Sequence, residues 1–169
     1  MSTLLLATVL CGGLFPNVAP TDKLQVSATV MGGTGLSLAG VGKQTYGDRS
    51  PAFIVAEVGI VHPDVEWLEL APSVMLEVEG RVGFALLPKI RARLPGKRAR
   101  LYALGGIPIF VAPYSMLGIQ AGFGISVALH KRIALVAEGT ATAYVWGSDL
   151  MKKSALGKLD AQLGIKVTF

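Results

Sequence analysis

The last twelve residues of the chain, 158–169, alternate strictly between apolar and polar side chains. The odd-numbered positions from 159 to 169 hold Leu, Ala, Leu, Ile, Val and Phe, and the even-numbered positions hold Lys, Asp, Gln, Gly, Lys and Thr. Successive side chains of a β-strand point to opposite faces. The segment is therefore predicted to be a strand with one apolar face and one polar face, set either in the wall of a membrane barrel or at the edge of a soluble sandwich.

The composition favours a membrane setting. Hydrophobic residues make up 51% of the 169 residues and charged residues only 16%, against about 25% charged in soluble domains. No window of the sequence holds the 18 or more uninterrupted apolar residues typical of a spanning helix. A closed β-barrel is the other structure that satisfies its backbone inside lipid, so a barrel is the predicted fold.

The same alternation recurs in eight segments: 24–38, 53–60, 67–76, 84–94, 100–111, 117–129, 133–145 and 158–169. The polar stretches 41–51 and 147–157 are predicted to be loops, and residues 62–64, 95–98 and 130–132 tight turns. Pro72 cannot donate a ladder hydrogen bond, so a bulge or kink is expected there. The predicted fold class is all-β, an eight-stranded antiparallel up-and-down transmembrane β-barrel with a polar, side-chain-filled interior.

Charged side chains fall on the faces opposite the apolar ones. Acids and bases occur there in similar number, and unpaired charges in a narrow lumen are costly, so ion pairs are expected across the interior. The mixture of signs argues against an ion-selective pore. The acids could alternatively form an acid–base site, although beside cations they are more typical of structural pairs. The predicted lumen network comprises Glu57, Glu69, Lys89, Arg91, Arg93, Glu138, Asp160 and Lys166.

Aromatic residues near the ends of the predicted strands are typical of the belts at the two membrane interfaces. The residues assigned to these belts are Trp67, Tyr102, Tyr114, Tyr144, Trp146 and Phe169.

Residues 1–21 contain the apolar run 4–10 and then a break at Gly12, Gly13 and Pro16. This pattern predicts a signal peptide or N-terminal apolar segment, with residues 22–169 as the barrel domain. No Lys or Arg precedes the apolar run. Two alternatives stay open: a lipidated Cys11, or a segment that belongs to the folded domain.

An alternating terminal strand that ends in an aromatic residue resembles the C-terminal signal of bacterial outer-membrane β-barrels. The matching positions are Leu163, Ile165, Val167 and Phe169. Over residues 22–169 the chain is similar to the small barrels of the OmpA-like transmembrane-domain kind. This resemblance implies a monomer in the outer membrane of a Gram-negative bacterium, surrounded by outer-membrane lipid and assembled by machinery that reads the C-terminal strand.

The predicted function is a structural or surface-interaction role without an open pore and without enzymatic activity. One alternative is a carrier that passes small hydrophobic molecules through the barrel wall, for which Pro72, Pro88 and Pro108 are the only hint. A second is a lipid-modifying enzyme, although His62 and His130 fall at tight turns without an adjacent Ser and acid. A third is a soluble lipocalin-like barrel whose apolar face points inward to a ligand.

No cofactor and no metal are expected. The two histidines lie far apart in sequence, and the single cysteine, Cys11, lies outside the barrel segment. The net charge of +5 includes no basic cluster beyond Arg98, Arg100 and their neighbours. Nucleic-acid binding is therefore not predicted.

Overall fold

The computed structural model describes residues 24–169 except 42–43, 81, 97 and 149–153. The segment 1–21, with its predicted signal peptide and Cys11, lies outside the described residues. The described chain contains one short 3-10 turn, η1 (Pro63–Val65), and no helix with the length and apolarity needed to cross a membrane. The strands are β1 (Gln25–Val41), β2 (Gln44–Val61), β3 (Leu68–Glu77), β4 (Gly83–Arg93), β5 (Ala99–Gly106), β6 (Ile109–Ala112), β7 (Met116–Ala128), β8 (Ile133–Gly147) and β9 (Ser154–Thr168).

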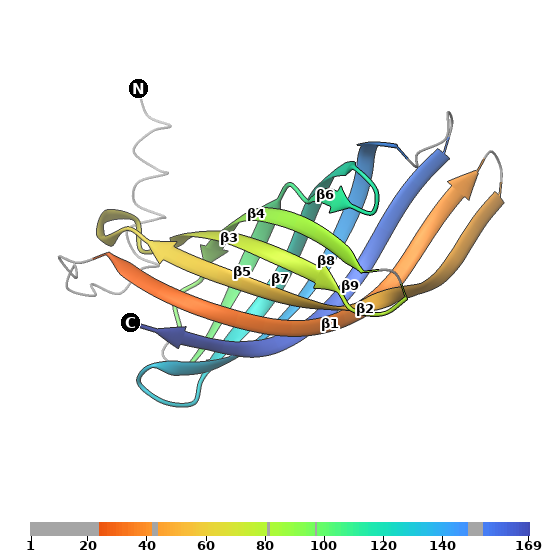
Figure 1. The fold of residues 1–169 in the computed structure, drawn as a ribbon. Helices are drawn as coiled ribbons and strands as arrows, with labels where there is room; N and C mark the ends of the chain where they lie inside the picture. Colours follow the sequence, from red (N-terminus) through yellow and green to blue (C-terminus); the bar gives the residue numbers. More distant parts are fainter. Residues whose placement is uncertain (1–23, 42–43, 81, 97, 149–153) are drawn as a thin grey trace, which may run out of the picture.

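The strands form one antiparallel sheet that closes on itself (Figure 1). The hydrogen-bonded order runs β3-β2-β1-β9-β8-β7-β5-β4, and the pairing of β3 with β4 completes the ring. The short strand β6 pairs with the same two neighbours as β5, namely β4 and β7, so β5 and β6 together occupy one of eight places. The prediction of an eight-stranded, up-and-down antiparallel barrel is confirmed.

The prediction of a loop over residues 41–51 is wrong. Residues 44–50 are the first part of β2 and pair with residues 35–41 of β1, which leaves only residues 42–43 between the two strands. The second predicted loop, 147–157, is also wrong at both ends, because Gly147 belongs to β8 and residues 154–157 belong to β9 and pair with β1. In Figure 1, β1, β2 and β9 run beyond the ends of β3 and β4. Polar side chains do not oppose strand pairing where both faces of a hairpin meet water, so the backbone partners decided the conformation.

The predicted strand 100–111 is interrupted at Ile107 and Pro108. Pro108 has no N–H for the ladder, and its side chain is fully buried. The break is bridged because Ile107 N donates to Pro88 O over 3.1 Å and Gly118 N donates to Pro108 O over 2.9 Å. The wall therefore stays closed across the interruption.

Of the bulge or kink predicted at Pro72, the bulge is absent, because neither ladder of β3 shifts register there. Pro72 lies directly opposite Pro88 in a β3–β4 ladder whose register does not shift. On the other side, the β2–β3 ladder is interrupted between the pairs Glu57–Ser73 and Ile60–Leu70. The missing donor of Pro72 thus removes pairing locally without adding a residue.

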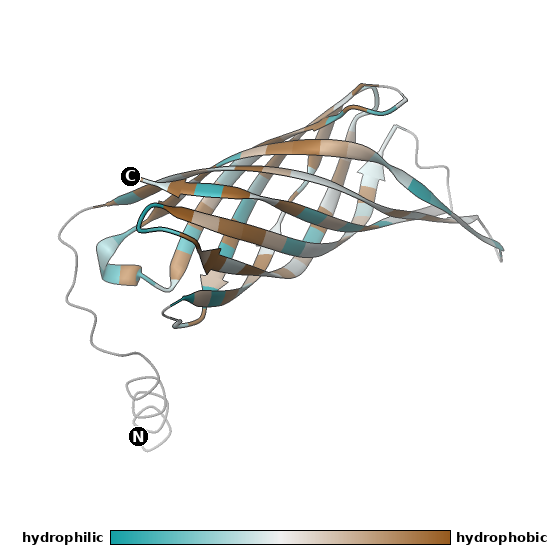
Figure 2. Ribbon diagram, turned by 90° about the horizontal axis from the view of Figure 1, so that it is seen from below, coloured by the Kyte–Doolittle hydropathy of each residue, from teal (hydrophilic) through white to brown (hydrophobic). Residues whose placement is uncertain are grey.

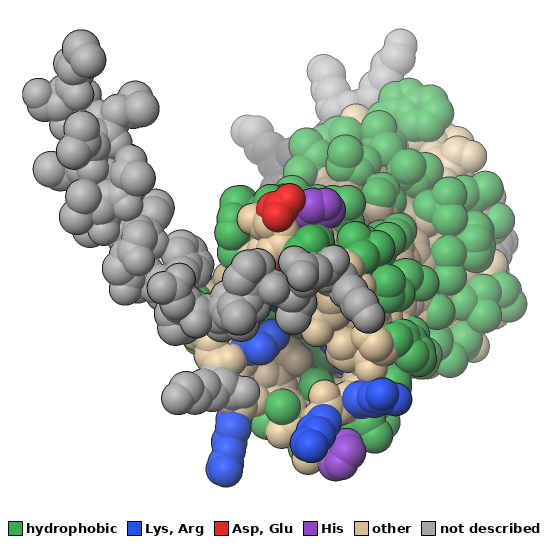
Figure 3. All heavy atoms as spheres, turned by 90° about the vertical axis from the view of Figure 1, so that its left-hand side faces the viewer, with side chains coloured by type: hydrophobic (Ala, Val, Ile, Leu, Met, Phe, Trp, Pro, Cys, Tyr) green, Lys and Arg blue, Asp and Glu red, His purple; other side chains and the backbone are tan. Residues whose placement is uncertain are grey.

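The two faces of the wall differ in chemistry as the alternation predicts. Large apolar side chains cover the outside, for example Phe123 at 75% exposure and Ile119 at 62%. Figure 2 shows hydrophobic segments along the strands of the barrel wall, and Figure 3 shows apolar side chains on the outside of the wall in space-filling form. The inside holds both the buried charges and an apolar cluster, whose members include Met31, Phe53, Val55, Met75, Leu87, Leu104, Phe110, Met116, Val136 and Tyr144.

Candidate functional site

Arg91 is the centre of a buried ion-pair cluster inside the barrel. Its side chain leaves β4 and contacts the carboxylates of Glu57 on β2, Glu69 on β3 and Glu138 on β8. Arg91 Nη2 donates to Glu57 Oε2 over 2.8 Å, and Nη1 lies 3.3 Å from Glu69 Oε1. Arg91 is 2% exposed and the three carboxylate side chains are at most 1% exposed. One guanidinium therefore ties three other strands together across the lumen.

Other polar groups complete the cluster around the three carboxylates. Lys89 Nζ lies 2.8 Å from Glu57 Oε2 and 3.6 Å from Glu138 Oε2. The hydroxyl of Tyr102 donates to Glu138 Oε1 over 2.9 Å, and Gln162 Nε2 donates to Glu138 Oε2 over 2.5 Å. Each oxygen of Glu138 thus has a donor besides the cations.

Glu69 joins the cluster to the end of the barrel where the chain terminates. Lys166 Nζ on β9 donates to Glu69 Oε1 over 2.6 Å, and Arg93 Nη1 on β4 lies 3.7 Å from Glu69 Oε2. Three carboxylates and four cations are therefore held together, drawn from β2, β3, β4, β8 and β9.

Strand parity and register explain why these side chains meet. Lys89, Arg91 and Arg93 are alternate residues of β4 and so share its inner face. Arg91 and Glu69 are Cα partners in the β3–β4 ladder, which places opposite charges directly across from each other. Such buried ions lose hydration, and only mutual pairing with well-placed hydrogen bonds offsets that cost.

Seven of the eight predicted lumen residues lie in this cluster, and Asp160 does not. Asp160 is half-buried on β9, where it pairs with Gly35 and Thr140 nearer the other end of the barrel. At that end Lys158 Nζ donates to Glu77 Oε1 over 2.8 Å and lies 5.5 Å from the centre of the Phe110 ring. Glu77 was missed because it follows the last residue of the predicted third strand.

Three further polar residues of the interior were not predicted from the sequence. Lys158 and Gln162 stand on the polar face of the terminal strand, so the alternation alone could have selected them. Tyr102 was assigned to an interfacial belt, yet it is 5% exposed and lies inside, with its ring 5.1 Å from Arg91 Cζ. Tyr144 is likewise inside, at 7% exposure, edge-on to Phe110. Trp67, Trp146 and Phe169 are exposed.

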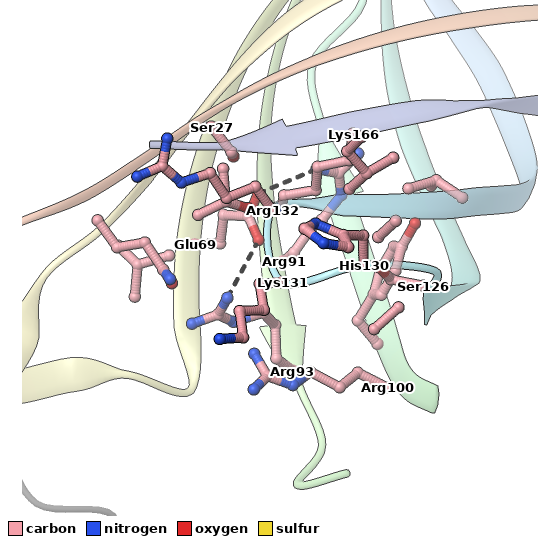
Figure 4. Close-up of a pocket in the computed structure, with 18 of the residues that line it drawn as sticks. Ser27, Glu69, Arg91, Arg93, Arg100, Ser126, His130, Lys131, Arg132 and Lys166 are labelled. Carbon is pink, nitrogen blue, oxygen red and sulfur yellow. Dashed lines mark hydrogen bonds and ion pairs between the residues drawn. The ribbon is translucent and has the colours of Figure 1, made fainter. Parts of the chain in front are cut away.

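A cavity of about 180 Å³ opens at the end of the barrel where the chain terminates (Figure 4). Arg91, Arg93 and Lys166 of the ion-pair cluster line it on the inside. Arg98, Arg100, Lys131 and Arg132 also line it, from the β4–β5 and β7–β8 connections and the adjoining start of β5. Figure 3 views the barrel from this end and shows exposed Lys and Arg side chains on it.

The histidines offer little chemistry. His62 lies 3.4 Å from Asp64 in an exposed turn. His130 and Ser126 both line the cavity (Figure 4), but no hydrogen bond joins these two described side chains. The described residues bring no three His, Cys, Asp or Glu side chains together in a way that could hold a metal ion.

The predicted assembly signal lies on the strand that closes the ring. β9 pairs with β8 and with the first strand, β1. Leu163, Ile165 and Phe169 are exposed on the outer wall at 56%, 54% and 75%, while Val167 is half-buried. Phe169 N donates to Val26 O over 3.0 Å, so the terminal residue is hydrogen-bonded to β1.

A closed ring with an apolar exterior and charges paired within it defines an eight-stranded β-barrel of the transmembrane kind. No family model matches the sequence, and no curated protein matches it. Solved structures do match. The N-terminal β-barrel domain of Pseudomonas aeruginosa OprF is 14% identical, with a TM-score of 0.59, over 86% of this chain and 97% of that one.

Two further structures agree. Neisserial surface protein A (NspA) is 13% identical with a TM-score of 0.53, covering 86% of this chain and 97% of NspA. A de novo designed transmembrane β-barrel is 12% identical with a TM-score of 0.53, covering 83% of this chain and 95% of the design. In fold, the chain resembles the small outer-membrane β-barrels of the OmpA-like kind.

Proposed function

We propose that the protein is an integral outer-membrane barrel with a structural or surface-interaction role and without an open pore. The observation that carries this proposal is the Arg91 cluster, in which one side chain pairs with carboxylates of β2, β3 and β8. The interior of an eight-stranded barrel is just wide enough to be filled by side chains. Here the cluster fills one part of it and the apolar cluster around Met31 and Phe53 another.

A membrane location is supported by the outer wall. Large apolar side chains such as Val30, Leu70 and Ile90 are more than half exposed, and contact with water over a whole barrel surface would be unfavourable. The soluble lipocalin-like alternative needs the reverse arrangement, with apolar residues inward and charges outward. Fractionation of the cell envelope, followed by gel mobility in detergent with and without heating, tests the location. Recovery of the protein in the soluble fraction would contradict it.

The absence of a pore is tested by conductance. We expect the purified protein in planar bilayers, and in liposome-swelling assays with small sugars, to give no more flux than protein-free membranes. The matched variant Arg91→Ala removes one cation from each of three carboxylates, which keep Lys89, Arg93 or Lys166 as partners, and it shortens the side chain that crosses the lumen. Solute flux through the unaltered protein at the level of a known porin would overturn the proposal.

A surface-interaction role is supported by the extension of β1, β2 and β9 past β3 and β4 (Figure 1). Residues 35–41 and 44–50 form a hairpin whose side chains include Tyr46, 56% exposed, and Leu38, 41% exposed. Deleting residues 37–48 should leave heat-modifiable mobility intact while removing any adhesion that the protein confers on cells. Unchanged adhesion would show that this hairpin is not the interaction surface.

We propose that the barrel-assembly machinery reads the C-terminal strand through Leu163, Ile165, Val167 and Phe169. Phe169 is exposed and makes one backbone hydrogen bond to Val26, so its side chain contributes little to the folded barrel itself. Phe169→Ser should lower the amount assembled in cells while leaving refolding of the purified protein in detergent unchanged. An equal loss in both assays would show a structural role instead.

One observation favours a second function, transfer of small hydrophobic molecules through the wall. Pro72 and Pro88 stand opposite each other. Pro108 lies between β5 and β6, next to Ile107, whose N–H donates to Pro88 O. Three neighbouring positions of the wall therefore lack backbone donors. Pro72→Thr and Pro88→Val together should slow uptake of a small alkane or aromatic in liposomes if this seam is a route. Equal uptake would exclude it.

A further inference from the structure

We propose that the basic mouth, defined as Arg98, Arg100, Lys131 and Arg132 around the cavity of Figure 4, binds phosphate oxyanions. The ligand would be the phosphoryl group of a small phosphorylated solute or of a lipid headgroup. This inference goes beyond the proposed structural role, and it depends on the ring of strands that brings the two connections together.

The charges lining the cavity are almost all positive. Among the described residues that line it, Glu69 is the one carboxylate, and that group is already paired with Arg91, Arg93 and Lys166. Glu69 therefore leaves no negative charge to balance the basic mouth.

The four residues of the basic mouth have no acidic partner among the described residues, because no carboxylate of the described chain lies within 4.0 Å of their charged nitrogens. Arg100 Nε donates to Gly96 O over 3.0 Å, which orients the guanidinium and uses one of its five N–H groups. The remaining donors of Arg100 are available to a ligand.

Their arrangement concentrates positive potential at one opening. Arg100 and Arg93 are diagonal neighbours on the inner faces of β5 and β4, where Arg93 pairs with Tyr102. Lys131 and Arg132 come from the β7–β8 connection, and Figure 4 shows them over the same opening as Arg100 and His130. A cleft lined by one sign of charge raises the local concentration of oppositely charged solutes.

The chemistry of the donors favours phosphate among anions. Arginine presents a planar fork that matches phosphate oxygens two at a time, and lysine adds a point charge. A cavity of about 180 Å³ corresponds to the volume of about six waters at roughly 30 Å³ each. This space accommodates one or two phosphoryl groups, whereas the side chains of the Arg91 cluster stop a larger ligand from passing further inward.

The test measures binding of inorganic pyrophosphate to the full chain in a non-ionic maltoside, by isothermal titration calorimetry at two salt concentrations. We expect saturable binding that weakens as salt increases. Arg100→Gln and Arg132→Gln should each weaken it about tenfold, as expected for loss of one charge-assisted contact. The matched control is Arg49→Gln, which removes an exposed arginine of β2 that is paired with Glu79 and is not among the residues lining the cavity. We expect this variant to bind as the unaltered protein does.

Two probes of equal charge distinguish the sources of the phosphoryl group. The two probes are dihexanoylphosphatidylglycerol and its deacylated headgroup, glycerophosphoglycerol. Tighter binding of the lipid would identify a lipid headgroup as the source of the phosphoryl group, and equal affinities would identify a soluble ligand. Heat-modifiable mobility of each variant confirms that it folds, so failure here is distinct from failure of the barrel proposal. Lack of pyrophosphate binding, or an equal loss in Arg49→Gln, would overturn the proposal.

Discussion

The guanidinium of Arg91 and the carboxylate of Glu57 meet inside the barrel, with Nη2 2.8 Å from Oε2 and a second contact through Nη1. The pair is two-pronged and nearly inaccessible to water. Lys89 contacts the same carboxylate from the same strand as Arg91. Glu57 therefore contacts two cations, Lys89 and Arg91. A buried charge is stable only when it is paired, so each of these three side chains depends on the other members of the cluster.

Removing Arg91 should destabilise the barrel strongly. Arg91→Met keeps the bulk of the side chain but leaves three carboxylates with fewer cations, and breaking a buried pair in this way costs about 3–5 kcal/mol. The measurement is urea unfolding in detergent, followed by gel mobility. The control Arg49→Met breaks an exposed pair with Glu79 and should leave the unfolding midpoint almost unchanged. Equal midpoints for the two variants would show that the cluster adds no stability.

A charge on the outer wall should be tolerated only near the rim. Val74 is 41% exposed in the middle of β3, and Val78 is 51% exposed one residue beyond its end. Val74→Arg should cost about 2–4 kcal/mol and Val78→Arg about 0–1 kcal/mol, because the penalty in lipid falls toward the interface. Unfolding in lipid vesicles measures both. If the two costs were alike, β3 would not span the hydrocarbon region as proposed.

Two glycines on neighbouring strands should respond differently to an added methyl group. A Cβ on Gly122 would lie 2.3 Å from the backbone oxygen of Gly139, whereas a Cβ on Gly139 would meet only the Phe123 ring at 3.7 Å. Gly122→Ala should therefore cost about 1–3 kcal/mol, as overpacking does, and Gly139→Ala should be tolerated. Thermal or urea unfolding of the two variants compares them, and a more stable Gly122→Ala would refute the close approach.

Glu79, between β3 and β4, should contribute stability that depends on pH. The Ala52 N–H donates to its carboxylate over 3.0 Å and Arg49 lies beside it, and these contacts lower the pKa of Glu79 below its ordinary value. A lowered pKa stabilises the fold above the unfolded-state pKa, and this contribution is lost as the pH falls through the folded-state pKa.

The group is exposed, so the effect should be small. Glu79→Gln should lower the urea midpoint slightly at pH 7 and leave no difference from the unaltered protein once Glu79 is protonated. A carbon-detected NMR titration of the Glu79 carboxyl measures the pKa directly. A value above that of glutamate in a model peptide would contradict the proposed contacts.

The sequence by itself determined which face of each strand is apolar, because side-chain direction repeats every two residues whatever the strand pairs with. It therefore selected Arg91, Glu138 and Lys166 as interior residues, and it predicted a ring of eight. Local composition misled it at residues 44–50, whose polar side chains are compatible with pairing outside the wall, and at residues 154–157, which pair with β1.

Only the tertiary structure decided which interior charges meet. Arg91 and Glu138 are far apart in sequence and come from β4 and β8, so their contact depends on the closure and register of the whole ring. The same closure leaves Asp160 outside the Arg91 cluster and brings Arg98 and Arg100 to the opening shared with Lys131 and Arg132. Alternation is a local property of each strand, whereas contacts across a lumen depend on the stagger between strands, which no single segment encodes.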